Sequence, residues 1–143
     1  MTAQLAPYLF FASNECREAM EHYQRVLGGD LNVMTMGDLP EGEDRPPSAT
    51  EDMVMNAALV LPGGALLMAS DDATGEVGEF SAFAVSIVLD DAHEAARIFD
   101  ELLDGGQAHM PFGPTFWSPA FGMGVDRFGV EWMVNVGDPG ATS

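Results

Sequence analysis

The sequence predicts an α+β fold of two βαβββ modules, residues 1–73 and 74–143, whose mixed sheets curl around a shared cleft. Three observations lead to this prediction. The expected elements occur twice in the same order, two amphipathic helices share a pattern, and a pair of glycines closes each helix. One βαβββ unit cannot cover both faces of its sheet, whereas two units can curl their sheets together.

The first module begins with an expected strand over residues 4–12, with Pro7 near its start or on an edge. Apolar side chains at helical spacing predict a helix over residues 15–27, for which Ser13 and Asn14 are candidate caps. The remaining strands are expected over residues 30–36, 53–61 and 65–70. A polar, acidic segment with three prolines, residues 37–52, is expected to form a loop.

The second module repeats this order after an expected loop of acidic and glycine residues. Its first strand is expected over residues 80–89, and its helix over residues 92–103, with Asp91 and Glu94 spaced as a variant of the capping box. A short strand over 107–112 and a final hairpin follow, and the turn "DRFG" joins the two strands of the hairpin.

The two predicted helices support an internal duplication. "EAMEHYQRVLGG" and "EAARIFDELLDGG" share the Glu-Ala start, an aromatic residue four positions past the alanine, apolar closing positions and the paired glycine. Two unrelated amphipathic helices can share this much by chance. The matching order of all the elements favours duplication.

Composition excludes several classes of partner. Five arginines, no lysine and 23 acidic residues give a formal net charge of −18, which repels phosphate backbones and anionic lipids, so neither nucleic acid nor a membrane is expected as a partner. The single cysteine, Cys16, excludes an intramolecular disulfide and is interpreted as a small buried side chain. With no apolar run of about 18 residues and no signal peptide, a soluble cytoplasmic protein is expected.

Three stretches of the chain carry a family resemblance: "PYLFFASNECREAMEHYQRVLGGDL", "LLMASD" and "MPFGPTFWSPAFGMGVDRFGVEWMVN". With the βαβββ repeat, they resemble the vicinal oxygen chelate superfamily of glyoxalase I, extradiol dioxygenases and bleomycin-resistance proteins, and within it the PhnB-like branch. The resemblance implies the glyoxalase/bleomycin resistance/dioxygenase fold. Automated naming sometimes labels this branch 3-demethylubiquinone-9 3-methyltransferase, but no glycine-rich nucleotide loop follows an expected strand.

The resemblance also implies where a metal would bind. Active members of the superfamily hold a divalent metal through His and Glu side chains on the strands, and the matching positions here are Pro7 or Tyr8, Asn56, Phe83 and Met133. None of these is His, Asp or Glu, and an amide oxygen is a weak ligand for a transition metal. We therefore expect no metal and no cofactor, and a divalent metal stays open as an alternative.

The three histidines fall at different kinds of position. His22 and His93 fall on the predicted helices and are expected to be solvated, whereas His109 lies on a short strand from which it could reach a pocket. One histidine without a second ligand makes a poor metal site. Glu131 alternates with Trp132, so the two side chains are expected on opposite faces of the last strand, and whether Glu131 or His109 reaches the cleft is left open.

The aromatic residues near the C-terminus have two interpretations, namely core or subunit packing and the lining of a ligand pocket. If a pocket exists, its expected lining is Tyr8, Asn56, Phe116, Trp117 and Trp132. The function expected is metal-free binding of a small molecule of unknown identity by a homodimer, with no catalytic residue assigned. The alternative is a metal-dependent enzyme of glyoxalase or dioxygenase type that acts on a substrate with vicinal oxygens.

Overall fold

The computed structural model describes residues 3–12, 14–45 and 47–137. The chain divides into two compact units, Met1–Glu79 and Phe80–Ser143, and each unit is described by itself. The module boundary expected after residue 73 falls in the segment that connects the last strand of the first unit to the first strand of the second.

Unit 1 is a four-stranded sheet with one α-helix. In chain order its elements are β1 (Tyr8–Phe11), α1 (Cys16–Leu27), β2 (Asp30–Thr35), the short 3₁₀ helix η1 (Met36–Asp38), β3 (Val54–Val60) and β4 (Leu66–Asp71). The strands lie in the order β1-β4-β3-β2. Strand β1 is parallel to β4, and the other pairs are antiparallel, so the sheet is mixed.

Unit 2 has the same order of elements. They are β5 (Val85–Leu89), α2 (Ala92–Leu102), β6 (Gln107–Gly113), β7 (Ala120–Val125) and β8 (Glu131–Val136). The strand order β5-β8-β7-β6, with β5 parallel to β8, reproduces that of unit 1. The predicted fold class, two βαβββ modules with mixed sheets, is therefore confirmed, and the shared cleft stays a prediction.

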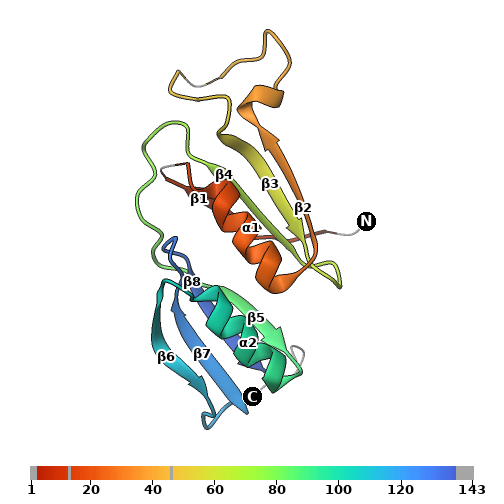
Figure 1. Ribbon diagram of the computed structural model, residues 1–143, viewed down its shortest axis with the longest axis vertical. Helices are drawn as coiled ribbons and strands as arrows, with labels where there is room; N and C mark the ends of the chain where they lie inside the picture. The colour runs from red at the N-terminus through yellow and green to blue at the C-terminus, as the bar shows by residue number, and fades with distance from the viewer. Residues whose placement is uncertain (1–2, 13, 46, 138–143) are drawn as a thin grey trace. The chain divides into compact units, whose positions relative to one another are not determined.

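Each helix covers one face of its own sheet, as Figure 1 shows for both units. In unit 1, α1 buries Ala19, Met20 and Tyr23, while Leu9 and Phe11 are the buried residues of β1. In unit 2, α2 buries Ile98, Phe99 and Leu102, and every second residue of β8 is buried: Trp132, Val134 and Val136. Burial thus alternates along β1 and β8, as expected for strands of a sheet with one helix-covered face.

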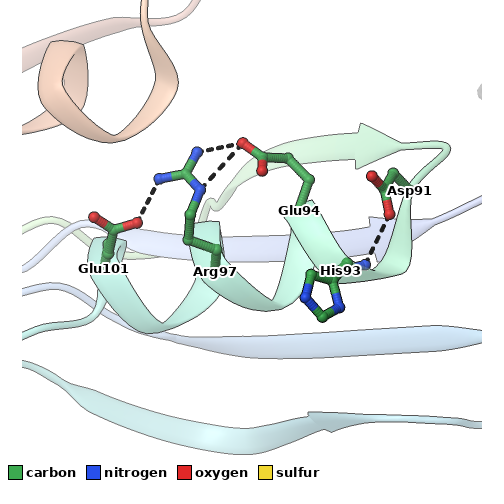
Figure 2. A network of polar contacts seen from close by, with 5 residues as sticks. All are labelled: Asp91, His93, Glu94, Arg97 and Glu101. Atoms are coloured by element: carbon green, nitrogen blue, oxygen red, sulfur yellow. Dashed lines mark hydrogen bonds and ion pairs between the residues drawn. The ribbon is translucent and has the colours of Figure 1, made fainter.

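The two helices begin differently. The side chain of Asp91 accepts a hydrogen bond from the His93 backbone N–H at 2.9 Å, which confirms its capping role in α2 (Figure 2). In the same figure, Glu94 pairs with Arg97 along the helix, and Arg97 also pairs with Glu101. Glu94 therefore forms an ion pair with Arg97, instead of the hydrogen bond to the backbone N–H of Asp91 that a capping box would have.

The start of α1 differs from the prediction, because no side chain caps this helix from the preceding residues that the structure describes. Ser13 lies outside the described residues, and the side-chain amide of Asn14 donates to Asp52 at 3.1 Å. The backbone N–H of Cys16 instead donates to the carboxylate of Asp71 on β4 at 2.9 Å. A carboxylate 55 residues away along the chain thus satisfies a helix end that the local sequence does not.

Two predicted strands are shorter in the structure. The first starts at Tyr8 rather than residue 4, because Pro7 has no N–H to donate to a ladder. Strand β5 starts at Val85 rather than residue 80, and Ala82, with a φ of 64°, breaks the extended backbone before it. In the part of the chain that the structure describes, no helix is long and apolar enough to cross a membrane.

Candidate functional site

Each sheet has a second face that its own helix does not cover, called here the helix-free face. On β1, Tyr8 and Phe10 alternate with the buried Leu9 and Phe11, and they are 38% and 51% exposed. On β3, Asn56 is partly buried next to the fully buried Ala57. Tyr8, Phe10 and Asn56 therefore lie on the helix-free face of unit 1.

Tyr8 and Asn56 are joined across this face. The Tyr8 hydroxyl donates a hydrogen bond to Asn56 Oδ1 at 3.1 Å, although 48 residues separate them in the chain. Strand β4 lies between their two strands, with Met68 opposite Tyr8 in the register. The ring of Phe10 lies beside that of Tyr8, with centroids 5.0 Å apart. Two of the predicted site residues thus form one polar pair next to an exposed aromatic ring.

Phe10 is a site residue that sequence reasoning missed. Its position two residues after Tyr8 on a strand places both side chains on one face, and this alternation was the available signal.

On the helix-free face of unit 2, His109 and Glu131 form a pair. His109 Nδ1 lies 3.1 Å from Glu131 Oε2, with side-chain exposures of 47% and 21%. The two residues come from β6 and β8, with β7 between them. Glu131 lies on the face opposite the buried Trp132, so the predicted alternation is confirmed.

Two predicted aromatic residues lie together in the connection between β6 and β7. Phe116 and Trp117 are 97% and 45% exposed, and their ring centroids are 4.9 Å apart. The Trp117 ring also contacts Phe121, with centroids 5.6 Å apart. This segment is anchored by the buried Ser118, whose hydroxyl is 2.5 Å from Asn135 Oδ1 and 3.0 Å from the Val136 carbonyl oxygen.

Trp132 is placed differently from the other predicted lining residues. It is 1% exposed, lies on the helix-covered side of β8, and donates its indole N–H to Asp126 at 2.9 Å. Within unit 2, Trp132 is therefore a core residue, which corresponds to the packing interpretation rather than to the pocket lining. It does not lie on the same face as Glu131 and Met133.

The expectation for His22 is wrong. Its side chain is 6% exposed on α1, with its ring beside that of Tyr23, whereas His93 on α2 is exposed as expected. His22 falls on the apolar side of α1 between Ala19 and Val26, so the helix rotation that buries them also buries the imidazole.

The donor set does not fit the divalent metal that the superfamily implies. Its implied positions hold the phenol of Tyr8, the amide of Asn56, the phenyl ring of Phe83 and the thioether of Met133. Transition metals that bind vicinal oxygens prefer imidazole and carboxylate ligands. Among the described residues, no group of three or more His, Cys, Asp and Glu side chains is arranged to hold a metal ion.

Comparisons with known proteins give the family. A family model described as 3-demethylubiquinone-9 3-methyltransferase matches residues 3–135. The chain belongs to this family. Protein YjdN of Escherichia coli is 34% identical over 139 residues, which cover 92% of this chain and 94% of that protein. The predicted PhnB-like resemblance is thus confirmed.

Solved structures agree with the fold. Protein PA1353 from Pseudomonas aeruginosa matches with a TM-score of 0.83 and 43% identity, over 94% of this chain and 98% of that one. A putative 3-demethylubiquinone-9 3-methyltransferase, PhnB protein, from Bacillus cereus has a TM-score of 0.74 and 22% identity, over 94% and 100% of the two chains. A glyoxylase/bleomycin resistance protein/dioxygenase domain from Frankia is 15% identical, with a TM-score of 0.63 over 99% and 96%, and shows the fold alone.

Proposed function

We propose that this chain binds a small, flat organic molecule on the helix-free face of unit 1, without a divalent metal. The observation that supports the proposal is the Tyr8–Asn56 hydrogen bond of 3.1 Å beside the exposed ring of Phe10. An apolar surface with a few fixed polar groups is typical of small-molecule sites. The positions at which the superfamily resemblance implies metal ligands carry no imidazole or carboxylate in this chain.

The polar pair suggests the chemistry of the ligand. Asn56 Oδ1 accepts the bond from Tyr8, so the two N–H groups of the same amide are not used in that bond. They can donate to a carbonyl oxygen of a ligand whose ring packs against Phe10 and Tyr8. We therefore propose a neutral aromatic carbonyl compound as the ligand class. The exposed rings of Phe116 and Trp117 offer a separate aromatic surface in unit 2.

The test is an NMR titration with benzamide and acetophenone as probes. The Asn56 side-chain amide signals are expected to shift on binding, and Asn56→Ala is expected to weaken binding about tenfold, the equivalent of one net hydrogen bond. Gln24→Ala is the control, because it removes a carboxamide from α1, which covers the opposite face of the sheet. Equal weakening by both variants, or no shift with either probe, would contradict the proposal.

Metal analysis tests the other half of the proposal. The purified protein is expected to contain no stoichiometric Ni, Zn, Fe or Mn. A stoichiometric divalent metal whose removal abolishes binding would support the enzyme alternative instead.

We also propose that the chain is a homodimer. The exposed rings of Phe116 and Phe83, which lie outside the proposed ligand site, provide apolar surface that a second subunit could cover. Sedimentation velocity is expected to give the mass of two chains, and a monomer at micromolar concentration would contradict this proposal.

A further inference from the structure

Three methionines form a row across the helix-free face of unit 2. In the strand register, Met110 on β6 pairs with Met123 on β7, and Met123 pairs with Met133 on β8. Directly paired residues of antiparallel strands project from the same face of the sheet. Met133 alternates with the buried Trp132 and Val134, so this face is the one that α2 leaves open.

The spacing allows the three sulfur atoms to converge. Neighbouring strands lie about 4.8 Å apart, and a methionine side chain has three rotatable bonds. The outer methionines can therefore lean over the central one without a change in the backbone. Met110 is 39% exposed and the other two are partly buried, so the row is accessible from one side.

An imidazole lies next to this row. His109 precedes Met110 at an irregularity in the β6–β7 pairing, and its Nδ1 is 3.1 Å from Glu131 Oε2. This contact leaves Nε2 as the ring nitrogen that can act as a ligand. A histidine that binds a metal normally has its other ring nitrogen bonded to a carboxylate or carbonyl, and the contact has that form.

We propose that Met110, Met123, Met133 and His109 Nε2 form a binding site for Cu(I). Thioethers are soft ligands that select Cu(I) over the hard divalent ions, and imidazole is compatible with it. Glu131 acts as a positioning residue that orients the imidazole. The site lies on a different sheet from the proposed small-molecule site and does not depend on it.

The test is an anaerobic titration of the whole chain with Cu(I), kept reduced by ascorbate, in competition with a chromophoric Cu(I) chelator. We expect about one equivalent to bind, with sulfur and nitrogen neighbours in X-ray absorption spectra. Met123→Leu keeps the apolar shape and removes the central sulfur, so the affinity should fall more than about tenfold. His109→Gln and Glu131→Gln should each weaken binding by a smaller factor.

Two matched controls separate this site from general thioether or imidazole binding. Met34→Leu changes a methionine that is 47% exposed on β2, and His93→Gln changes an exposed histidine on α2. Both should leave Cu(I) affinity unchanged. The proposal is overturned if the wild-type chain fails to compete with the chelator, or if Met34→Leu weakens binding as much as Met123→Leu. Circular dichroism of each variant checks that the fold is retained.

Discussion

Trp132 donates its indole N–H to Asp126 Oδ2 at 2.9 Å, which ties the last strand to the turn that precedes it. Oδ1 of the same carboxylate accepts the backbone N–H groups of Phe128 and Val130 at 2.9 and 3.0 Å. Asp126 is 3% exposed and Trp132 is 1% exposed. One buried carboxylate therefore organises both the turn and the largest side chain of the unit 2 core.

Replacing Asp126 should destabilise the fold. Asp126→Asn places an N–H group where the carboxylate accepts from Trp132, and an unsatisfied buried donor costs about 1–3 kcal/mol. We expect the free energy of unfolding to fall by about 2 kcal/mol in urea denaturation followed by circular dichroism. Asp100→Asn, at an exposed position on α2, is the control and should change it by less than about 0.5 kcal/mol. Similar effects of the two variants would show that the buried bonds contribute little.

The Asp126 turn shows what the sequence can and cannot predict. Local patterns predicted the turn, the helices closed by paired glycines, and the opposite faces of Glu131 and Trp132, because each depends on residues a few positions apart. The hydrogen bond from the Trp132 indole to Asp126 was not predicted, because it depends on which face of β8 the helix covers. Periodicity separates the two faces of a strand without telling which one a helix covers.

Contacts across non-adjacent strands were harder to predict. Tyr8 with Asn56, and His109 with Glu131, each cross an intervening strand, so the strand order and register decide whether they meet. The order β1-β4-β3-β2 is not contained in any local pattern. The burial of His22 is a related case, because a polar residue type predicts exposure although its position within the apolar stripe of α1 buries it.

Gly124 should be intolerant of any side chain. A Cβ atom there would lie 2.5 Å from the Gln107 carbonyl oxygen and 2.6 Å from Leu103 Cδ1, so backbone would have to move. We expect Gly124→Ala to lower the free energy of unfolding by about 2 kcal/mol, within the range for overpacked cores. Gly113→Ala is a matched control on β6, because no atom lies within 4 Å of its added Cβ. A Gly124→Ala variant as stable as Gly113→Ala would refute the close approach.

Cys16 should be unreactive in the folded chain. The side chain is fully buried, and burial, with a smaller contribution from Asp71, raises the pKa of the thiol from 9.0 to about 12. The reactive thiolate is therefore scarce at pH 8, and iodoacetamide should modify the native protein far more slowly than the protein in urea. Mass spectrometry of timed samples measures both rates. Comparable rates would mean that the start of α1 opens readily in solution.

The raised pKa of Cys16 also gives a signed pH dependence. The folded state favours the neutral thiol, so its contribution to stability is complete below pH 9 and is lost as the pH rises toward 12. Comparing the wild-type chain with Cys16→Ala across this window isolates the thiol from the tyrosines, which titrate in both. The difference in unfolding free energy between the two proteins should shrink as the pH rises.

Asp72 should titrate at an unusually low pH. Its carboxylate accepts hydrogen bonds from the Thr74 hydroxyl at 2.6 Å and from the Val77 backbone N–H at 2.8 Å, and these bonds, that of Thr74 first, lower the pKa from 3.8 to about 2. The ionised form is favoured in the fold, so its stabilising effect is present above pH 3.8 and is lost as the pH falls toward 2. Carbon-detected NMR of the Asp72 carboxyl group gives the midpoint directly. Thr74→Ala should move that midpoint toward 3.8, whereas a wild-type midpoint already near 3.8 would show that the turn is not formed in solution.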